Sequence, residues 1–263
     1  MALITRLRTH PRRQVAVAAS LLFATAVCLL QLGVRAVYAR STVHFHLVWN
    51  LFLAWLPMLS ALIAYNLATR GRWRSWLLVL PCLIFWLLFF PNAPYILTDM
   101  LHLRPQGNIP LWYDLILLIT FAWTGAFLGL ISLYLMQSLV RRAAGAWVSW
   151  LFTFAVLGLT GFGVYLGRFP RWNSWDVITN PSGLLLDIAG HFRHPVANAS
   201  AFVFSALFAL CLAAMYFMLV SIIEFRQGGG VKRFDAPILR SLNDPFVYFK
   251  ACGFRGLQSS KER

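Results

Sequence analysis

Long runs of apolar residues limit most strongly what this chain can fold into. A helix needs about 20 apolar residues to cross a bilayer, and only helices satisfy their own backbone hydrogen bonds within such a segment. Charged residues make up 12% of the 263 residues, about half the usual share in soluble domains. We therefore expect an all-α bundle of about six transmembrane helices, over residues 14–37, 46–69, 75–91, 112–139, 144–166 and 199–224.

The distribution of basic residues predicts how this bundle is oriented. The formal net charge is +15, but the basic residues gather in particular connections instead of forming one nucleic-acid-binding face. They occupy a basic N-terminal arm (1–13) and a basic tail (226–263), which flank the membrane bundle (14–225), and the connections 70–74 and 141–142. The positive-inside rule makes these segments cytoplasmic, N-in/C-in. We expect the lipid bilayer as partner, with anionic headgroups at the cytoplasmic face, and no nucleic acid.

Small residues recur at helix-packing spacing in three of the apolar stretches. Two of them carry G-x-x-x-G, and the last carries a ridge of small side chains at every fourth position: Gly125 and Gly129; Gly163 and Gly167; Ala201, Ser205, Ala209 and Ala213. Such residues let helix backbones approach closely within lipid. We expect these contacts to form within the chain in preference to a homodimer.

The stretch FFPNAPYILTDMLHL, residues 89–103, places polar groups at the outer end of the third span. Pro91 and Pro94 end this span, and Asn92 between them is placed to cap the short interfacial helix that follows. If residues 94–103 are helical, Tyr95, Thr98, Asp99 and His102 form one polar stripe. Polar residues near membrane depth are costly and often functional, so this stripe is a candidate site.

A second outer segment, GRFPRWNSWDVITNP at 167–181, is equally rich in polar and aromatic residues. Its two arginines could hold a phosphate or carboxylate, and its tryptophans could stack on a ligand or anchor at the headgroups. The stretch that follows, 182–194, is predicted to be a short amphipathic helix with Asp187 and His191 on one face. The candidate ligand-binding residues of the two outer segments are Asn92, Tyr95, Arg168, Arg171, Trp172, Asn173 and Trp175.

PNAPYILTDMLHL and GRFPRWNSWDVITNP both resemble signature segments of the bacterial membrane-protein family catalogued as domain of unknown function 1361. The resemblance covers residues 45–225, and it implies a multi-pass protein of the bacterial cytoplasmic (inner) membrane. It supplies no catalytic residues, because the family has no assigned activity.

Carboxylate and imidazole side chains in these segments allow two kinds of chemistry. Asp99 and His102, completed by Asp176 or by the pair Asp187 and His191, offer ligands that suit a divalent metal such as Zn, Mn or Fe. Alternatively, Asp99, His102 and Asp176 could act as general acids and bases on a lipid-linked substrate. The sequence leaves the cofactor, and whether the protein is an enzyme, open.

The leading hypothesis is an outward-facing polar site for an anionic or lipid-derived ligand. The alternative is a transporter or an accessory subunit in which the outer polar residues form an ion-pair lock, with Asp99 or Asp176 paired to Arg168 or Arg171. Both hypotheses predict that Asp99 or His102 lies within reach of Arg168, Arg171 or Asp176.

Overall fold

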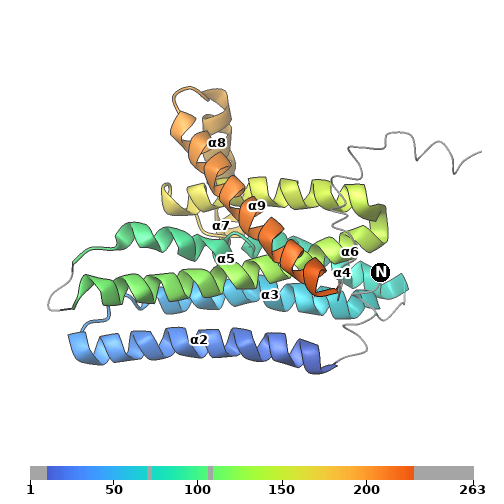
Figure 1. Cartoon of the computed structure of the whole chain (residues 1–263). Helices are drawn as coiled ribbons and strands as arrows, with labels where there is room; N and C mark the ends of the chain where they lie inside the picture. Colours follow the sequence, from blue (N-terminus) through green and yellow to red (C-terminus); the bar gives the residue numbers. More distant parts are fainter. Residues whose placement is uncertain (1–10, 70–72, 106–108, 228–263) are drawn as a thin grey trace, which may run out of the picture. The chain divides into compact units, whose positions relative to one another are not determined.

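The computed structural model describes residues 11–69, 73–105 and 109–227. Within these ranges all the regular structure is helical, as expected, and short connections join the helices. The elements are α2 (Pro11–Ala39), α3 (His46–Thr69), α4 (Trp73–Phe89), α5 (Asn92–Tyr95), the 3-10 helix η1 (Ile96–His102), α6 (Leu111–Arg168), α7 (Asp176–Thr179), α8 (Pro181–Arg193) and α9 (Ala199–Gln227) (Figure 1).

Five of these helices are long and apolar enough to cross a membrane. The candidate spans are Val15–Ala39, His46–Thr69, Leu77–Leu101, Leu111–Arg168 and Ala199–Phe225. The contacts described below lie within the unit that ends at Ile222. Of the second unit, Ile223–Arg263, the structure describes only residues 223–227, the end of α9. Most of the predicted basic arm and tail therefore lies outside the described residues.

Helix α6 contains a sharp break at Gly145. A straight helix of its 58 residues would be roughly 87 Å long, about three times the hydrocarbon thickness. Gly145 has φ 89° and ψ 176°, a backbone conformation that is essentially restricted to glycine. Figure 1 shows the chain turning back here, so α6 consists of a first arm, 111–144, and a second arm, 146–168. The sequence predicted separate spans 112–139 and 144–166, and the break lies just beyond the start predicted for the second.

Two clusters of buried apolar side chains form the interior of the bundle. One joins α2, α3, α5, η1 and the first arm of α6. The other joins α3, α4, α9 and both arms of α6. Buried polar pairs reinforce the second cluster: the indole N–H of Trp86 donates to Ser132 at 3.1 Å, and the hydroxyl of Tyr216 donates to Gln137 at 2.5 Å.

The first G-x-x-x-G motif packs against the short helix α5. A methyl group added to Gly125 would lie 2.6 Å from the carbonyl oxygen of Ala93, and one added to Gly129 would lie 3.1 Å from its Cβ. Only glycine therefore allows this approach without displacing backbone. The expectation of contacts within the chain is confirmed for this motif.

The second G-x-x-x-G motif contacts the same segment from the other arm of α6. A methyl group on Gly163 would lie 3.2 Å from Pro91, and one on Gly167 would lie 3.3 Å from the ring of Tyr95. The proline-rich segment is therefore held between the glycine faces of both arms of α6. This packing fixes the position of the polar stripe that follows.

The predicted ridge of small residues on α9 also packs within the chain. Gly161, two residues before Gly163 on α6, closely approaches the backbone carbonyl of Ser205, and Ala209 lies beside the same glycine. Ala201 is fully buried. The ridge therefore joins α9 to the second arm of α6.

Candidate functional site

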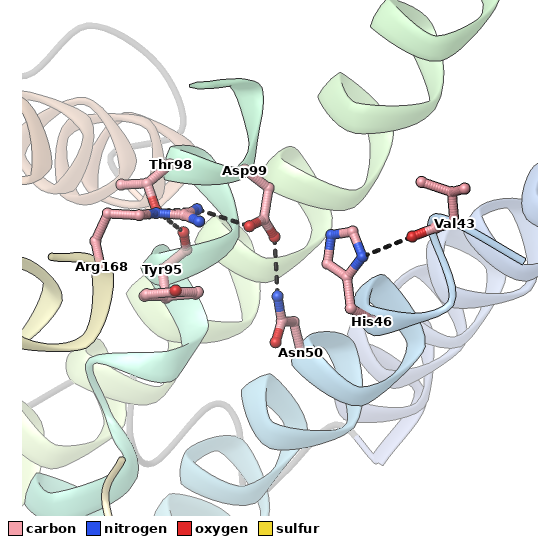
Figure 2. Close-up of polar contacts among 7 residues, drawn as sticks. All are labelled: Val43, His46, Asn50, Tyr95, Thr98, Asp99 and Arg168. Atoms are coloured by element: carbon pink, nitrogen blue, oxygen red, sulfur yellow. Dashed lines mark hydrogen bonds and ion pairs between the residues drawn. The ribbon is translucent and has the colours of Figure 1, made fainter. Parts of the chain in front are cut away.

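A buried ion pair joins the two outer segments. Nη2 of Arg168 lies 2.6 Å from Oδ1 of Asp99 (Figure 2). The side chain of Arg168 is 10% exposed and that of Asp99 is 2% exposed. The guanidinium also donates to the hydroxyl of Thr98, from Nε at 2.9 Å and from Nη2 at 2.6 Å. The prediction that Asp99 lies within reach of Arg168 is confirmed.

The local fold of 91–102 explains how these groups meet. Residues three apart lie almost above one another in a 3-10 helix, so Tyr95 and Thr98 share one side. The adjacent Asp99 lies about a third of a turn away, and Arg168 contacts all three residues. The Thr98 hydroxyl donates to the carbonyl of Tyr95 at 2.6 Å, and the Tyr95 ring lies 4.6 Å from the Arg168 guanidinium carbon. The predicted stripe is confirmed for Tyr95, Thr98 and Asp99. The side chain of His102 lies outside the described part of the structure, so its role remains a prediction.

Asn50 is a member of this network that the sequence did not reveal. Its amide Nδ2 donates to Oδ2 of Asp99 at 2.9 Å, so α3 contacts the ion pair from the opposite side (Figure 2). His46, one turn earlier on α3, directs Nδ1 to the carbonyl of Val43 at 3.1 Å. The sequence feature that could have indicated it is the one amide side chain in the first two turns of the predicted span 46–69.

A second buried ion pair, also missed from sequence, lies between α2 and α6. Arg35 binds Asp114 through two contacts, Nε to Oδ1 at 2.6 Å and Nη2 to Oδ2 at 2.9 Å, and each residue is 2% exposed. His44 is also buried, with Nε2 3.6 Å from Asp114 Oδ2. Burial first, and the nearby Arg35 second, lower the pKa of His44. Two sequence features could have indicated this pair: Arg35 lies inside the first predicted span, and Asp114 lies at the start of the fourth.

Asn92 does not cap the helix that follows it, which corrects the prediction. Helix α5 follows Pro91 without a side-chain cap. The Asn92 amide instead donates backward to the carbonyl of Phe89 at 3.0 Å, and across to the hydroxyl of Ser174 at 2.9 Å. Ser174 in turn donates to the carbonyl of Leu88 at 3.0 Å. These bonds hold the second outer segment against the end of α4.

The other polar residues of 172–191 form local contacts. Asp176 accepts from the backbone N–H of Asn173 at 2.7 Å, and this hydrogen bond is the main cause that lowers the pKa of its carboxyl. The Trp172 indole donates to Asp187 at 2.7 Å. His191 directs Nδ1 to the Asp187 carbonyl at 2.8 Å. The exposed Arg171, with φ 68°, forms no ion pair with these acids in the part of the chain that the structure describes.

The described members of the predicted metal site, Asp99, Asp187 and His191, do not form one ligand group. Both carboxylate oxygens of Asp99 accept hydrogen bonds, from Arg168 and Asn50, and the Asp187 carboxylate accepts from Trp172 and lies beside His191. Among the described residues, no three histidine, cysteine, aspartate or glutamate side chains gather into a group that could hold a metal. A metal that uses His102 remains a prediction from sequence.

A cavity of about 490 Å³ lies beside the Asp99–Arg168 pair. Neither charged residue lines it; Asn50 and Tyr95, which contact the pair, do. Its apolar lining comes from α3, α4, α8 and the second arm of α6, and includes Leu53, Ile84, Leu87, Leu159 and Leu184. Its polar lining comes from α3, α5 and the connection between α6 and α7, with Asn50, Asn92, Tyr95, Trp172, Asn173 and Ser174.

A family model described as protein of unknown function (DUF1361) matches residues 49–215. The chain belongs to this family. The DUF1361 match includes every residue that lines the cavity, together with Asp99 and Arg168. It leaves out Arg35 and His44. No curated protein and no solved structure matches the chain.

Proposed function

We propose that this DUF1361 protein binds a lipid-derived ligand in the cavity beside the Asp99–Arg168 pair. The observation that carries the proposal is the change in chemistry along the cavity. The lining passes from Ile84 and Leu87 on α4 to Asn92 at the start of α5, and on α3 Leu53 lies one turn deeper than Asn50. An amphipathic molecule would place its chain along the leucines and its head at the amides.

The size and position of the cavity support a lipid-derived ligand over a free anion. Ligand sites commonly measure about 300–1,000 Å³, so 490 Å³ suits a head group with part of a chain. The described lining contains no charged side chain, and Arg168 is already paired with Asp99. The anion-binding role predicted for Arg168 is therefore not part of the proposal. The ligand-binding roles of Asn92, Tyr95, Trp172 and Asn173 are.

The proposal includes an orientation in a bacterial cytoplasmic membrane. Arg141 and Arg142 lie close to the turn at Gly145, and the positive-inside rule places such a turn in the cytoplasm. The polar end of the cavity would then face outward. Single cysteines at positions 144 and 196, in a variant without the native cysteines, test this. We expect an impermeant maleimide to label Val196→Cys from outside and Ala144→Cys only after the membrane is opened; the reverse pattern contradicts the orientation.

Blocking the cavity tests the binding site. Leu87 lines the cavity, whereas Leu80, two turns earlier on α4 and 59% exposed, does not. We expect native mass spectrometry of the detergent-purified protein to show a retained lipid in the wild type and in Leu80→Trp. Leu87→Trp, which fills the apolar end, should lose it. Equal retention in both variants would show that the lipid binds elsewhere.

A second candidate function is a transporter or accessory subunit stabilised by an ion-pair lock. One observation favours it: Asp99 and Arg168 satisfy each other's charge and do not line the cavity. The double-mutant cycle in the Discussion tests the lock itself.

A further inference from the structure

We infer that the polar end of the cavity selects an uncharged head group rich in hydroxyls, such as the glycosyl or polyol head of a membrane lipid. This inference rests on the proposed function and specifies its ligand class. It follows from the direction of the hydrogen bonds that the lining residues already make. Those bonds direct the side-chain amide nitrogens of the lining to protein acceptors and leave its amide oxygens for a ligand.

Asn50 presents an acceptor to the cavity because Asp99 fixes its orientation. The amide lies 2.9 Å from Oδ2 of Asp99, and an ionised carboxylate can only accept hydrogen bonds. The nitrogen must therefore face Asp99, which leaves the Asn50 oxygen. Asn50 lines the cavity and is only partly buried, so this oxygen is available to a ligand there.

Asn92 also presents its amide oxygen to the cavity, because a protein acceptor fixes the orientation of its amide. Its nitrogen lies 3.0 Å from the carbonyl oxygen of Phe89, which only accepts, so the amide cannot be reversed without losing this bond. The same nitrogen donates to Ser174, whose own hydrogen is directed to the carbonyl of Leu88. The Asn92 oxygen therefore remains for a ligand.

Asn173, in the second outer segment, adds a third acceptor, because its nitrogens donate to another residue of the same segment. Both the backbone N–H and the side-chain nitrogen of Asn173 donate to Asp176, at 2.7 and 3.3 Å. The Trp172 indole N–H is directed to Asp187, and the Thr160 hydroxyl to the carbonyl of Val156. The Asn173 oxygen is left, so three amide oxygens line this end of the cavity.

These acceptors discriminate between head-group chemistries. A phosphodiester or carboxylate offers only acceptors, so it could use the Tyr95 hydroxyl and the Trp49 indole but would leave the three amide oxygens without a donor. An ammonium would supply donors, but the described lining holds no acid to balance its charge, because Asp99 is neutralised by Arg168. Hydroxyl groups donate to the amide oxygens, and each can accept from the Tyr95 hydroxyl or the Trp49 indole, both in the lining.

A competition between lipids in nanodiscs tests the head-group selectivity. The full-length protein is placed in phosphatidylcholine containing equal amounts of glucosyl diacylglycerol, phosphatidic acid and phosphatidylethanolamine with matched chains. Native mass spectrometry then measures which lipid stays bound. We expect the glucosyl lipid to be enriched several-fold over both others. Asn173→Ala should reduce this enrichment about fivefold, the effect of one hydrogen bond. Asn198→Ala is the control, because the Asn198 amide donates to the carbonyl of His194 and the residue lies outside the lining, so this variant should leave the enrichment unchanged.

A charge-introducing variant makes the test sharper. Asn173→Lys replaces an acceptor by a cationic donor, so the preference should move toward phosphatidic acid. If wild-type protein enriches phosphatidic acid or phosphatidylethanolamine, or retains all three lipids equally while Leu87→Trp retains none, the head-group inference is wrong and the lipid-binding proposal stands. If the wild type and Leu87→Trp retain the same lipids in the same amounts, both are wrong.

Discussion

Removing the charges of Asp99 and Arg168, singly and together, tests whether their pair holds the outer segments in place. Breaking a buried ion pair costs about 3–5 kcal/mol because the remaining charge is left unbalanced. Asp99→Asn leaves Arg168, which keeps Thr98 and the Tyr95 ring and is 10% exposed, so we expect about 3 kcal/mol. Arg168→Gln leaves Asp99, 2% exposed with Asn50 as its other partner, so we expect about 5 kcal/mol.

The double variant separates the interaction from the cost of each change. With both charges removed, neither is stranded, and the double variant should be more stable than Arg168→Gln alone. A coupling energy of about 2–3 kcal/mol is the expectation for groups in direct contact. Thermal unfolding of the purified variants in one detergent measures it. Arg171→Gln is the matched control, because this exposed arginine of the same loop should change stability by less than about 0.5 kcal/mol.

Two results would refute this reasoning. Single variants as stable as the wild type would show that the pair contributes nothing to holding the segments. Strictly additive losses in the double variant would show that the two charges act through other partners. From the sequence, Arg168 was a candidate for ligand binding and Asp99 a candidate for catalysis or metal binding, with an ion-pair lock as the alternative. The geometry favours the lock, because each charge is buried against the other and neither lines the cavity.

Three further substitutions test the fold and its pH dependence by the same unfolding assay. Gly145→Ala should cost about 1–3 kcal/mol because the break in α6 needs φ 89°, whereas Gly158→Ala, in open helix, should cost nothing. Gly125→Ala should cost about 1–3 kcal/mol because its methyl group would meet the backbone of α5, whereas Gly33→Ala on α2 meets no atom within 4 Å. Burial lowers the pKa of His44, so the unfolded chain binds the proton more readily, and stability should fall as the pH drops below about 6.5. His44→Gln should reduce this loss, and an unchanged pH profile would contradict the assignment.

Much of the helix layout could be predicted because span length depends on local composition. The apolar runs gave spans close to those observed, and the G-x-x-x-G motifs marked where backbones approach each other. The stripe from Tyr95 to Asp99 followed from helical spacing alone. The position of the break in α6 was harder to predict, since Arg141 and Arg142 suggested a connection there, while the helix continues through them to Gly145.

The pairings between distant segments could not be predicted from one sequence. Asn50 and Asp99 are 49 residues apart, and Arg35 and Asp114 are 79 apart. Nothing in local spacing selects these partners over others, because they meet only after the helices have packed. Asn92 shows the same limit, since its position suggested a local cap while its amide bonds a loop 82 residues away.

A buried ion pair usually either stabilises the fold or takes part in a ligand site. Here Asn50 links the two roles. Asp99 binds Arg168 with one carboxylate oxygen and fixes the Asn50 amide with the other. In the double variant Asp99→Asn/Arg168→Gln the amide introduced at position 99 can donate or accept, so Asn50 is free to adopt either orientation. We therefore expect the double variant to regain stability and to keep a bound lipid, yet to enrich the glucosyl lipid less than the wild type in the nanodisc competition. An unchanged preference would show that Asp99 stabilises the fold without setting the chemistry of the cavity.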